Sequence, residues 1–154
     1  MDRTIIDRYA AGATIPAKAI EGMTKSDLLA APVPGRWTTQ QVIIHLMDAD
    51  LVGAERMKRV IAEERPLLLG YDQTAFARSL FYDRLDAALA CEVFEHNRRL
   101  MATILRQLPD EAFKRTGVHS ERGLETLEEL VKGYVDHVDH HLRFIQEKRK
   151  ALGK

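Results

Sequence analysis

The sequence is poor in cysteine and aromatic residues and carries no excess of either charge. Cys91 is the only cysteine, which excludes an internal disulfide and any metal cage built from thiolates. Aromatic residues make up 6% of the chain, which disfavours a surface for stacking nucleic-acid bases. Lys and Arg number 23, as do Asp and Glu, so no basic excess points to nucleic acid or anionic lipid. A bound metal must therefore be held by nitrogen and oxygen, and we expect neither nucleic acid nor membrane as a partner.

The chain also lacks long apolar runs. Met1 is followed by Asp2 and Arg3 instead of an apolar segment, so we expect neither a transmembrane helix nor a signal peptide. Its 154 residues suffice for one domain but are few for two, and no repeat or low-complexity tract divides them. These features predict a single domain over residues 1–154, located in the cytoplasm.

Four long segments place apolar residues at the spacing of amphipathic helices, whereas the alternation typical of strands is almost absent. The segments cover about residues 3–23, 39–64, 85–108 and 127–150. Four helices of this length can bury their apolar faces only against one another. The sequence therefore predicts an all-α fold, a four-helix bundle with antiparallel or mixed packing.

Local signals mark where these helices begin. Thr38 with Gln41, and Thr126 with Glu129, have the spacing of capping boxes, in which each side chain bonds the other residue's backbone N–H. Pro16 lies inside the first segment, so we expect a kink there.

Two further stretches can be interpreted from their composition. The third segment carries an apolar stripe that we interpret as its core face, formed by Leu85, Leu89, Val93, Leu100, Ile104 and Leu108. Residues 116–123 (TGVHSERG) are rich in turn-forming types and are expected to form a loop.

Three of the six histidines, His137, His140 and His141, lie close together in the last helical segment. Side chains four residues apart stand about 5–6 Å from each other on one helix face, which suits two imidazoles binding one ion. On a helical wheel His141 lies inside the apolar stripe, His137 at its edge, and His140 about 100° from His141. We therefore predict that His137 and His141 point inward and that His140 is solvated. The alternative is a pair of partly buried histidines bonded to carboxylates such as Asp136 or Asp139.

His45 interrupts the apolar run VIIHLM in the second helical segment. A polar side chain in such a run needs a partner, because burying it unpaired is costly. The broad apolar face of this helix permits His45 to face the last helix without requiring it. Asp48 lies on the same side of the helix and can orient the His45 imidazole or act as a base; a solvated surface carboxylate is the alternative.

Three stretches, in this order and spacing, resemble the DinB-like superfamily over nearly the whole chain: PGRWTTQQVIIHLMDAD, RRLMATILRQLPDEAF and GLETLEELVKGYVDHVDHHLRFI. The resemblance implies a bundle of up-down-down-up topology and a divalent metal held by one histidine of the second helix and two of the last. In this sequence those positions are His45, His137 and His141. The family includes bacillithiol-dependent and mycothiol-dependent enzymes.

Three imidazole ligands leave a coordination position open for water or substrate, as catalytic sites do, and they suit zinc or nickel. The resemblance implies a thiol S-transferase that joins a low-molecular-weight thiol to an electrophilic small molecule. Two alternatives remain open. One is a metal-dependent hydrolase or isomerase, and the other is a non-catalytic, stress-associated helical homodimer whose metal site is structural or vestigial.

The remaining candidate residues have simpler interpretations. Cys91 is expected to be a small packing residue of its helix. His96 is expected at the surface, with a position facing the metal as the alternative, and His119 is expected either to cover a site or to be exposed. For Arg98 and Arg99 we expect a solvated helix face, the alternative being contact with an anionic substrate.

Overall fold

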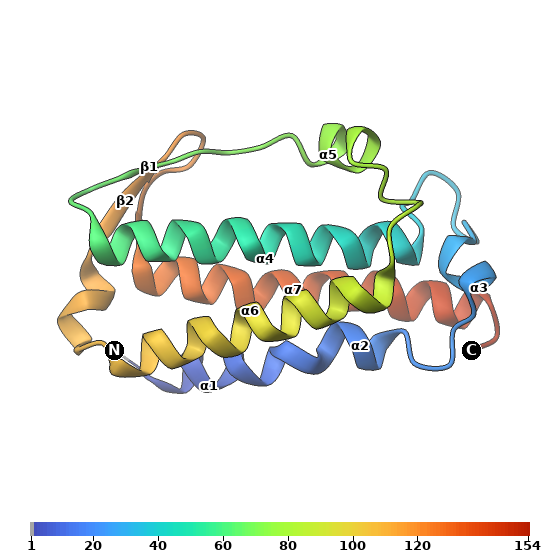
Figure 1. Cartoon of the computed structure of the whole chain (residues 1–154), viewed down its shortest axis with the longest axis horizontal. Helices are drawn as coiled ribbons and strands as arrows, with labels where there is room; N and C mark the ends of the chain where they lie inside the picture. Colours follow the sequence, from blue (N-terminus) through green and yellow to red (C-terminus); the bar gives the residue numbers. More distant parts are fainter. Residues whose placement is uncertain (1) are drawn as a thin grey trace.

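Four helical segments run side by side and form the bundle that the sequence predicts (Figure 1). The computed structural model describes residues 2–154, so Met1, the first residue of the expected domain, lies outside the described part. In Figure 1, α4 and α6 run in one direction, and α1, α2 and α7 run in the other, which is the up-down-down-up topology. The elements are α1 (Thr4–Ala11), a 3-10 turn (Gly12–Thr14), α2 (Ile15–Ala19), α4 (Thr39–Ala62), α6 (Ala87–Gln107) and α7 (Leu127–Ala151).

The connections carry the remaining structure, including a small sheet at one end of the bundle. α3 (Lys25–Leu29) precedes α4, and the crossover from α4 to α6 contains β1 (Leu67–Leu68) and α5 (Gln73–Ser79). A 3-10 turn (Asp110–Lys114) leads from α6 to β2 (Thr116–His119) and β3 (Gly123–Thr126). β2 is the central strand, parallel to β1 and antiparallel to β3.

The prediction of a loop over residues 116–123 was therefore wrong. Val118 lies opposite Leu67 of β1 and Leu124 of β3, so the central strand has backbone partners on both sides. These strands are too short to show an alternating pattern in the sequence. Gly123 has a φ of +81°, which a residue with a side chain rarely adopts, and it opens the returning strand.

Both predicted capping boxes are present. At the start of α4 the Gln41 backbone N–H donates to the Thr38 hydroxyl at 3.1 Å, and the Thr38 N–H donates to the Gln41 side chain at 2.9 Å. Thr126 and Glu129 make the same exchange at the start of α7, at 3.1 and 2.8 Å. Because these bonds satisfy donors that a helix start leaves free, they fix where the two helices begin.

The first helical segment breaks one turn earlier than predicted. The break is the 3-10 turn at Gly12–Thr14, and Pro16 lies in the first turn of α2, where a missing N–H costs no hydrogen bond. A Cβ on Gly12 would collide with a guanidinium nitrogen of Arg98, so the chain passes close to that side chain. α2 then ends at Ala19.

The interpretation of the leucine stripe as the core face of α6 was wrong for most of its length. Leu85, Leu89, Val93 and Leu100 are 39, 58, 37 and 59% exposed, and only Ile104 and Leu108 pack against the core. The sequence pattern misled because Arg98 interrupts the apolar residues of the buried face. The buried face consists of Ala87, Ala90, Cys91, Phe94, Arg98, Met101, Ala102 and Leu105.

Even with the exposed apolar side chains of α6, no helix within residues 2–154 is long and apolar enough to cross a membrane.

Arg98 lies in the core, which corrects the expectation of a solvated position; its neighbour Arg99 is exposed as expected. The Arg98 guanidinium, on α6, donates to Asp50 of α4 at 2.7 Å, to the Tyr134 carbonyl of α7 at 2.6 Å and to the Tyr9 carbonyl of α1 at 3.4 Å. Both members of the ion pair are 1% exposed. One side chain therefore links the four helical segments of the bundle.

We expect Arg98→Met to lower the free energy of unfolding by about 3–5 kcal/mol, because the Asp50 carboxylate would stay buried without its partner. Arg99→Ala is the matched control on the adjacent, exposed position, with an expected change within about 0.5 kcal/mol. Urea denaturation of the three proteins measures both values. A loss below about 1 kcal/mol for Arg98→Met would show that the ion pair does not hold the bundle together.

Candidate metal centre

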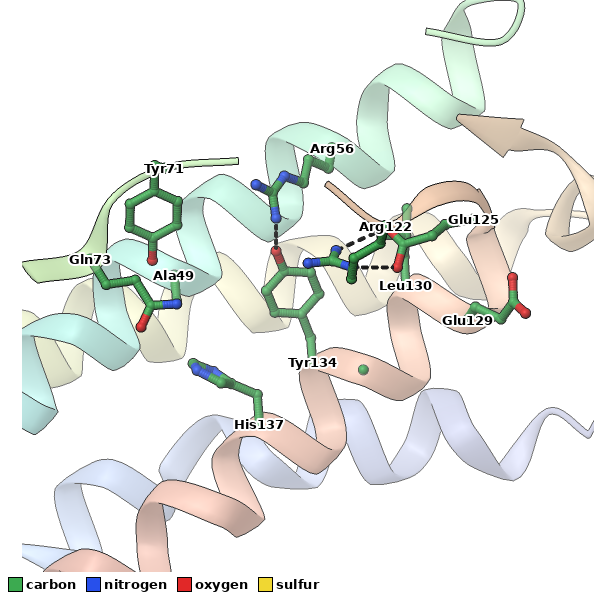
Figure 2. A pocket seen from close by; sticks show the side chains of 11 residues that line it. Ala49, Arg56, Tyr71, Gln73, Arg122, Glu125, Glu129, Leu130, Tyr134 and His137 are labelled. Carbon is green, nitrogen blue, oxygen red and sulfur yellow. Dashed lines mark hydrogen bonds and ion pairs between the residues drawn. The ribbon is translucent and has the colours of Figure 1, made fainter. Parts of the chain in front are cut away.

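A cavity of about 210 Å³ opens between α4, α7 and the segment that follows β1 (Figure 2). Its lining is polar on one side, with side chains from α4, the crossover, the hairpin and α7. At its inner end lies His137, the first of the candidate ligands. The polar and charged residues of the lining are Arg56, Tyr71, Gln73, Arg122, Glu125, Glu129, Tyr134 and His137.

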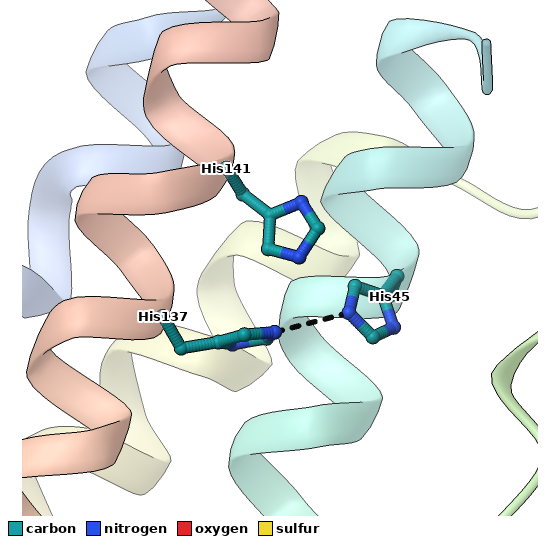
Figure 3. Close-up of side chains that lie close together, drawn as sticks. All are labelled: His45, His137 and His141. Carbon is teal, nitrogen blue, oxygen red and sulfur yellow. Dashed lines mark hydrogen bonds between the residues drawn. The ribbon is translucent and has the colours of Figure 1, made fainter.

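The structure brings His45, His137 and His141 together, as the sequence predicts (Figure 3). One nitrogen of each ring lies within 4.8 Å of the others, and the Nε2 atoms of His45 and His137 are 3.1 Å apart. The ring centroids of His137 and His141 are 4.5 Å apart. Two nitrogens bound to one tetrahedral zinc at about 2.0–2.1 Å lie about 3.3 Å from each other. The His45–His137 separation, a hydrogen bond between the two rings in Figure 3, is close to this value.

The helical register of α7 explains which histidines take part. His137 and His141 are one turn apart on the face of α7 that looks toward α4, while His140 is exposed, as the helical wheel predicts. His45 is fully buried on α4, and its ring meets that of Trp37 edge-on at 5.2 Å. The question that periodicity left open is thereby settled, since His45 faces α7.

Burial keeps the three imidazoles neutral. Removal from water lowers the pKa of His45 to about 4 and is the largest cause of the low pKa of His137 and of His141, each about 3. Nearby imidazoles add a smaller effect to the pKa of both histidines on α7. Because only a neutral imidazole has a free lone pair for a metal, the group has the right protonation state at neutral pH.

The group has hydrogen-bonding capacity that the chain does not use. Nδ1 of His45 and Nδ1 of His141 are buried and have no hydrogen-bond partner within residues 2–154. The alternative of histidines bonded to Asp136 or Asp139 is not what the structure shows, because Arg8 approaches both carboxylates instead. Three converging neutral imidazoles, without a carboxylate among them in the described part of the chain, are suited to hold one metal ion.

Asp48 does not orient the His45 imidazole. Its carboxylate accepts a hydrogen bond of 2.5 Å from the Tyr82 hydroxyl, whereas Nδ1 of His45 has no partner within residues 2–154 and Nε2 of His45 lies against His137. The role of Asp48 as a base stays a prediction. Tyr82 is fully buried, and its pKa is raised first by burial and then by the hydrogen bond to Asp48. Tyr82 therefore keeps its proton and holds the Asp48 carboxylate in place.

The remaining sequence candidates lie outside the histidine group. His96 is exposed and bonds the Glu92 carbonyl of its own helix. His119 is buried in β2 and does not belong to the histidine group, so the exposed position, one of its two alternatives, is excluded. Cys91 is buried, as expected, and burial raises the pKa of its thiol to about 12, which makes it a packing residue and not a nucleophile.

Sequence reasoning missed the other polar residues of the cavity. Arg56 lies eleven residues after His45, three helical turns, so it shares that face of α4; this spacing was the available signal. Tyr134 packs against Gly53, where a Cβ would overlap the tyrosine ring. Tyr71 comes from the crossover, and no sequence pattern connects it to α7.

A second cavity of about 210 Å³ borders the histidine group at His141. Trp37 and Phe144 supply apolar walls, and Arg36 and Lys148 supply positive charge. The histidine group therefore borders one cavity at His137 and another at His141.

Comparison with known proteins identifies relatives along most of the chain. A family model described as the DinB superfamily matches residues 16–145. The protein named "Putative metal-dependent hydrolase YfiT" from Bacillus subtilis is 32% identical over 143 residues, which cover 90% of this chain and 80% of that protein. "Putative metal-dependent hydrolase OB0782" from Oceanobacillus iheyensis is 32% identical over 111 residues, covering 72% of this chain and 64% of that protein.

A solved structure supports the same relationship. The structure described as "YfiT from Bacillus subtilis is a probable metal-dependent hydrolase with an unusual four-helix bundle topology" superposes with a TM-score of 0.91. It is 28% identical in sequence, and the match covers 97% of this chain and 86% of that one. The bundle seen here is therefore the fold of that protein.

We expect the stability of metal-free protein to fall as the pH drops from about 6.5 to 5. The unfolded chain takes up protons at histidines of ordinary pKa 6.5, whereas the folded imidazoles, with pKa values of about 4 and 3, stay neutral. Each histidine contributes up to about 1.4 kcal/mol per pH unit to the loss in the free energy of unfolding. Urea denaturation of chelator-treated protein gives the free energy of unfolding at each pH. Below pH 6.5 this free energy should fall less steeply with decreasing pH in His137→Phe than in the wild type, and above pH 7.5 the two curves should be parallel. Equal slopes below pH 6.5 would contradict the low pKa assigned to His137.

Zinc titration separates the two adjacent histidines of α7. We expect His137→Ala and His141→Ala to lower zinc affinity by orders of magnitude, because each removes one of three converging nitrogens. His140→Ala is the control, and its zinc affinity should match that of the wild type because His140 is exposed. Competition with a chromophoric chelator gives all the affinities. If His140→Ala lost the metal while His141→Ala kept it, the helical register of the site would be wrong.

Proposed function

The chain belongs to the DinB superfamily, and we propose that it is a metal-dependent enzyme that transfers a low-molecular-weight thiol to an electrophile. In this proposal His45, His137 and His141 hold one divalent ion, zinc or nickel. The support is the donor set itself, three neutral imidazoles, of which His45 is buried and the other two are half-buried, that converge within 4.8 Å. A structural zinc site is normally closed by four protein ligands, whereas three leave room for a reactant.

The ion would supply Lewis acidity, which lowers the pKa of a thiol or water molecule that enters from the cavity. The chain's own residues do the rest of the work. The three imidazoles orient the reacting group, and the rings of Trp37 and Tyr82, 6.5 Å apart, shield the His45 side from solvent. Tyr134 and Tyr71 wall the cavity through which a reactant reaches His137.

One observation favours a thiol over water as the nucleophile. Activation of water in metallohydrolases commonly uses a nearby carboxylate as base, as in the zinc proteases with an HExxH motif. Within residues 2–154 no carboxylate belongs to the histidine group, and Asp48 is engaged by the Tyr82 hydroxyl. A thiol, with an ordinary pKa of about 8.5, loses its proton far more readily than water and needs no such base.

Hydrolysis is the second candidate, and the names of the relatives favour it. Both relatives described above carry the name of a metal-dependent hydrolase. The same ion and the same three histidines would serve either reaction. The difference lies in which small molecule occupies the open position, so only an assay with both nucleophiles separates them.

We expect zinc- or nickel-loaded protein to accelerate the displacement of chloride from chlorodinitrobenzene by a thiol, which releases chloride and a proton, and His45→Ala to reduce the rate to background. Bacillithiol, mycothiol, glutathione and cysteine should each be tested, and His140→Ala should keep the wild-type rate. Hydrolysis of p-nitrophenyl acetate without thiol is measured in parallel. If only ester hydrolysis depended on His45, the hydrolase assignment would replace the transferase. If neither reaction did, the protein would be non-catalytic towards these substrates.

A further inference from the structure

Arg56 is a buried cation without an acidic partner. It is 5% exposed, donates to the Tyr134 hydroxyl at 3.0 Å and to the Leu69 carbonyl, and makes no ion pair within residues 2–154. Its Nε atom is buried and has no hydrogen-bond partner in the same part of the chain. Arg98, the other deeply buried arginine of the bundle, differs because Asp50 neutralises it.

Such a group is energetically costly unless something outside the chain compensates it. A guanidinium cannot lose its proton in a protein, so burial cannot neutralise it. A buried charge without a counter-ion lowers stability by several kcal/mol, and an unpaired donor adds to that cost. The missing counter-ion is therefore expected to be an anion that comes from solution.

A second unpaired donor lies in the same cavity. The Tyr71 hydroxyl is buried and has no hydrogen-bond partner within residues 2–154. Burial is the largest cause that raises the pKa of Tyr71 to about 12, so the group keeps its proton and can donate. Figure 2 shows Tyr71, Arg56 and Tyr134 around the same space, with His137 at its inner end.

The acidic side chains that line the cavity, Glu125 and Glu129, do not neutralise Arg56, because other donors engage them. Arg122 binds both oxygens of Glu125, at 2.8 and 2.9 Å, and these two charges cancel. Glu129 accepts from the Thr126 backbone and hydroxyl, both at 2.8 Å. Asp48, whose negative charge also acts on Tyr71, accepts from Tyr82. The positive charge of Arg56 thus stays available to a ligand.

We propose that this cavity binds a substrate through an oxyanion, a carboxylate or a phosphate, which pairs with the positive charge of Arg56 and accepts a hydrogen bond from the Tyr71 hydroxyl. Both side chains line the cavity, and charge-assisted bonds of this kind are about twice as strong as neutral ones. The placement of the substrate's reacting end next to His137 rests on the proposed function. The binding of the anion to Arg56 does not rest on it. The substrate is accordingly an acidic small molecule.

Calorimetric titration with succinate, inorganic phosphate and neutral succinamide tests the anion site. Metal-free and zinc-loaded protein are both used, so that binding to the ion is separated from binding to Arg56. We expect succinate or phosphate to bind both forms and succinamide to bind neither; the tighter of the two anions identifies the oxyanion. Tyr71→Phe and Arg56→Gln should each weaken that binding about tenfold or more.

Two controls keep the outcome clear. Arg59→Gln removes an exposed arginine from the same helix and should change anion affinity less than about twofold. Tyr71→Phe removes a hydroxyl without a partner, so it should not unfold the protein even if Arg56→Gln does. Unchanged anion affinity in Tyr71→Phe and in any folded Arg56→Gln, or no anion binding by metal-free wild type, would overturn the proposal. If the anion site failed this test while zinc affinity was normal, the proposed function would still stand. If the protein bound the anion but not zinc, the anion site would stand and the proposed function would fail.

Discussion

The hydrogen bonds of Arg98 set the frame on which the rest of the structure depends. From α6 this side chain reaches Asp50 of α4, the Tyr134 carbonyl of α7 and the Tyr9 carbonyl of α1, all inside the core. Burial raises the pKa of Asp50 while Arg98 opposes that effect, so the pair is stable only when both partners are present. Apolar packing tolerates small shifts of one helix along another, whereas the hydrogen bonds of Arg98 are all made in only one arrangement of the helices.

The position of the network also explains why a histidine group can form in the middle of a bundle. The core divides into two apolar clusters: α4 contributes residues 42–46 to one and 54–60 to the other, with Asp50 between them. On α6, Phe94 and Met101 belong to different clusters, with Arg98 between them. Asp50 lies five residues after His45, and Tyr134 lies three before His137. The link that fixes α4 against α7 therefore also brings the imidazoles of those helices together, with their rings edge-on to one another.

The sequence predicted those features that depend on one helix at a time. Capping boxes gave the starts of α4 and α7, and the helical wheel separated His141 from His140, because both depend only on local geometry. The core face of α6 was not predictable in this way, since its buried arginine makes sense only beside Asp50. The sheet and the position of Tyr71 follow from contacts between segments far apart in the chain, for which one sequence holds no signal.

Folding and metal binding would be coupled in this arrangement. The chain brings one nitrogen of each imidazole within 4.8 Å of the others, and their lone pairs would gain a partner when an ion binds. An ion that binds the native state alone stabilises it in proportion to the logarithm of its free concentration over its dissociation constant. The Arg98 network does not share this dependence, because all its partners are within the chain. The Arg98 network therefore holds the helices together without an ion, and an ion held by the histidines would add to that stability.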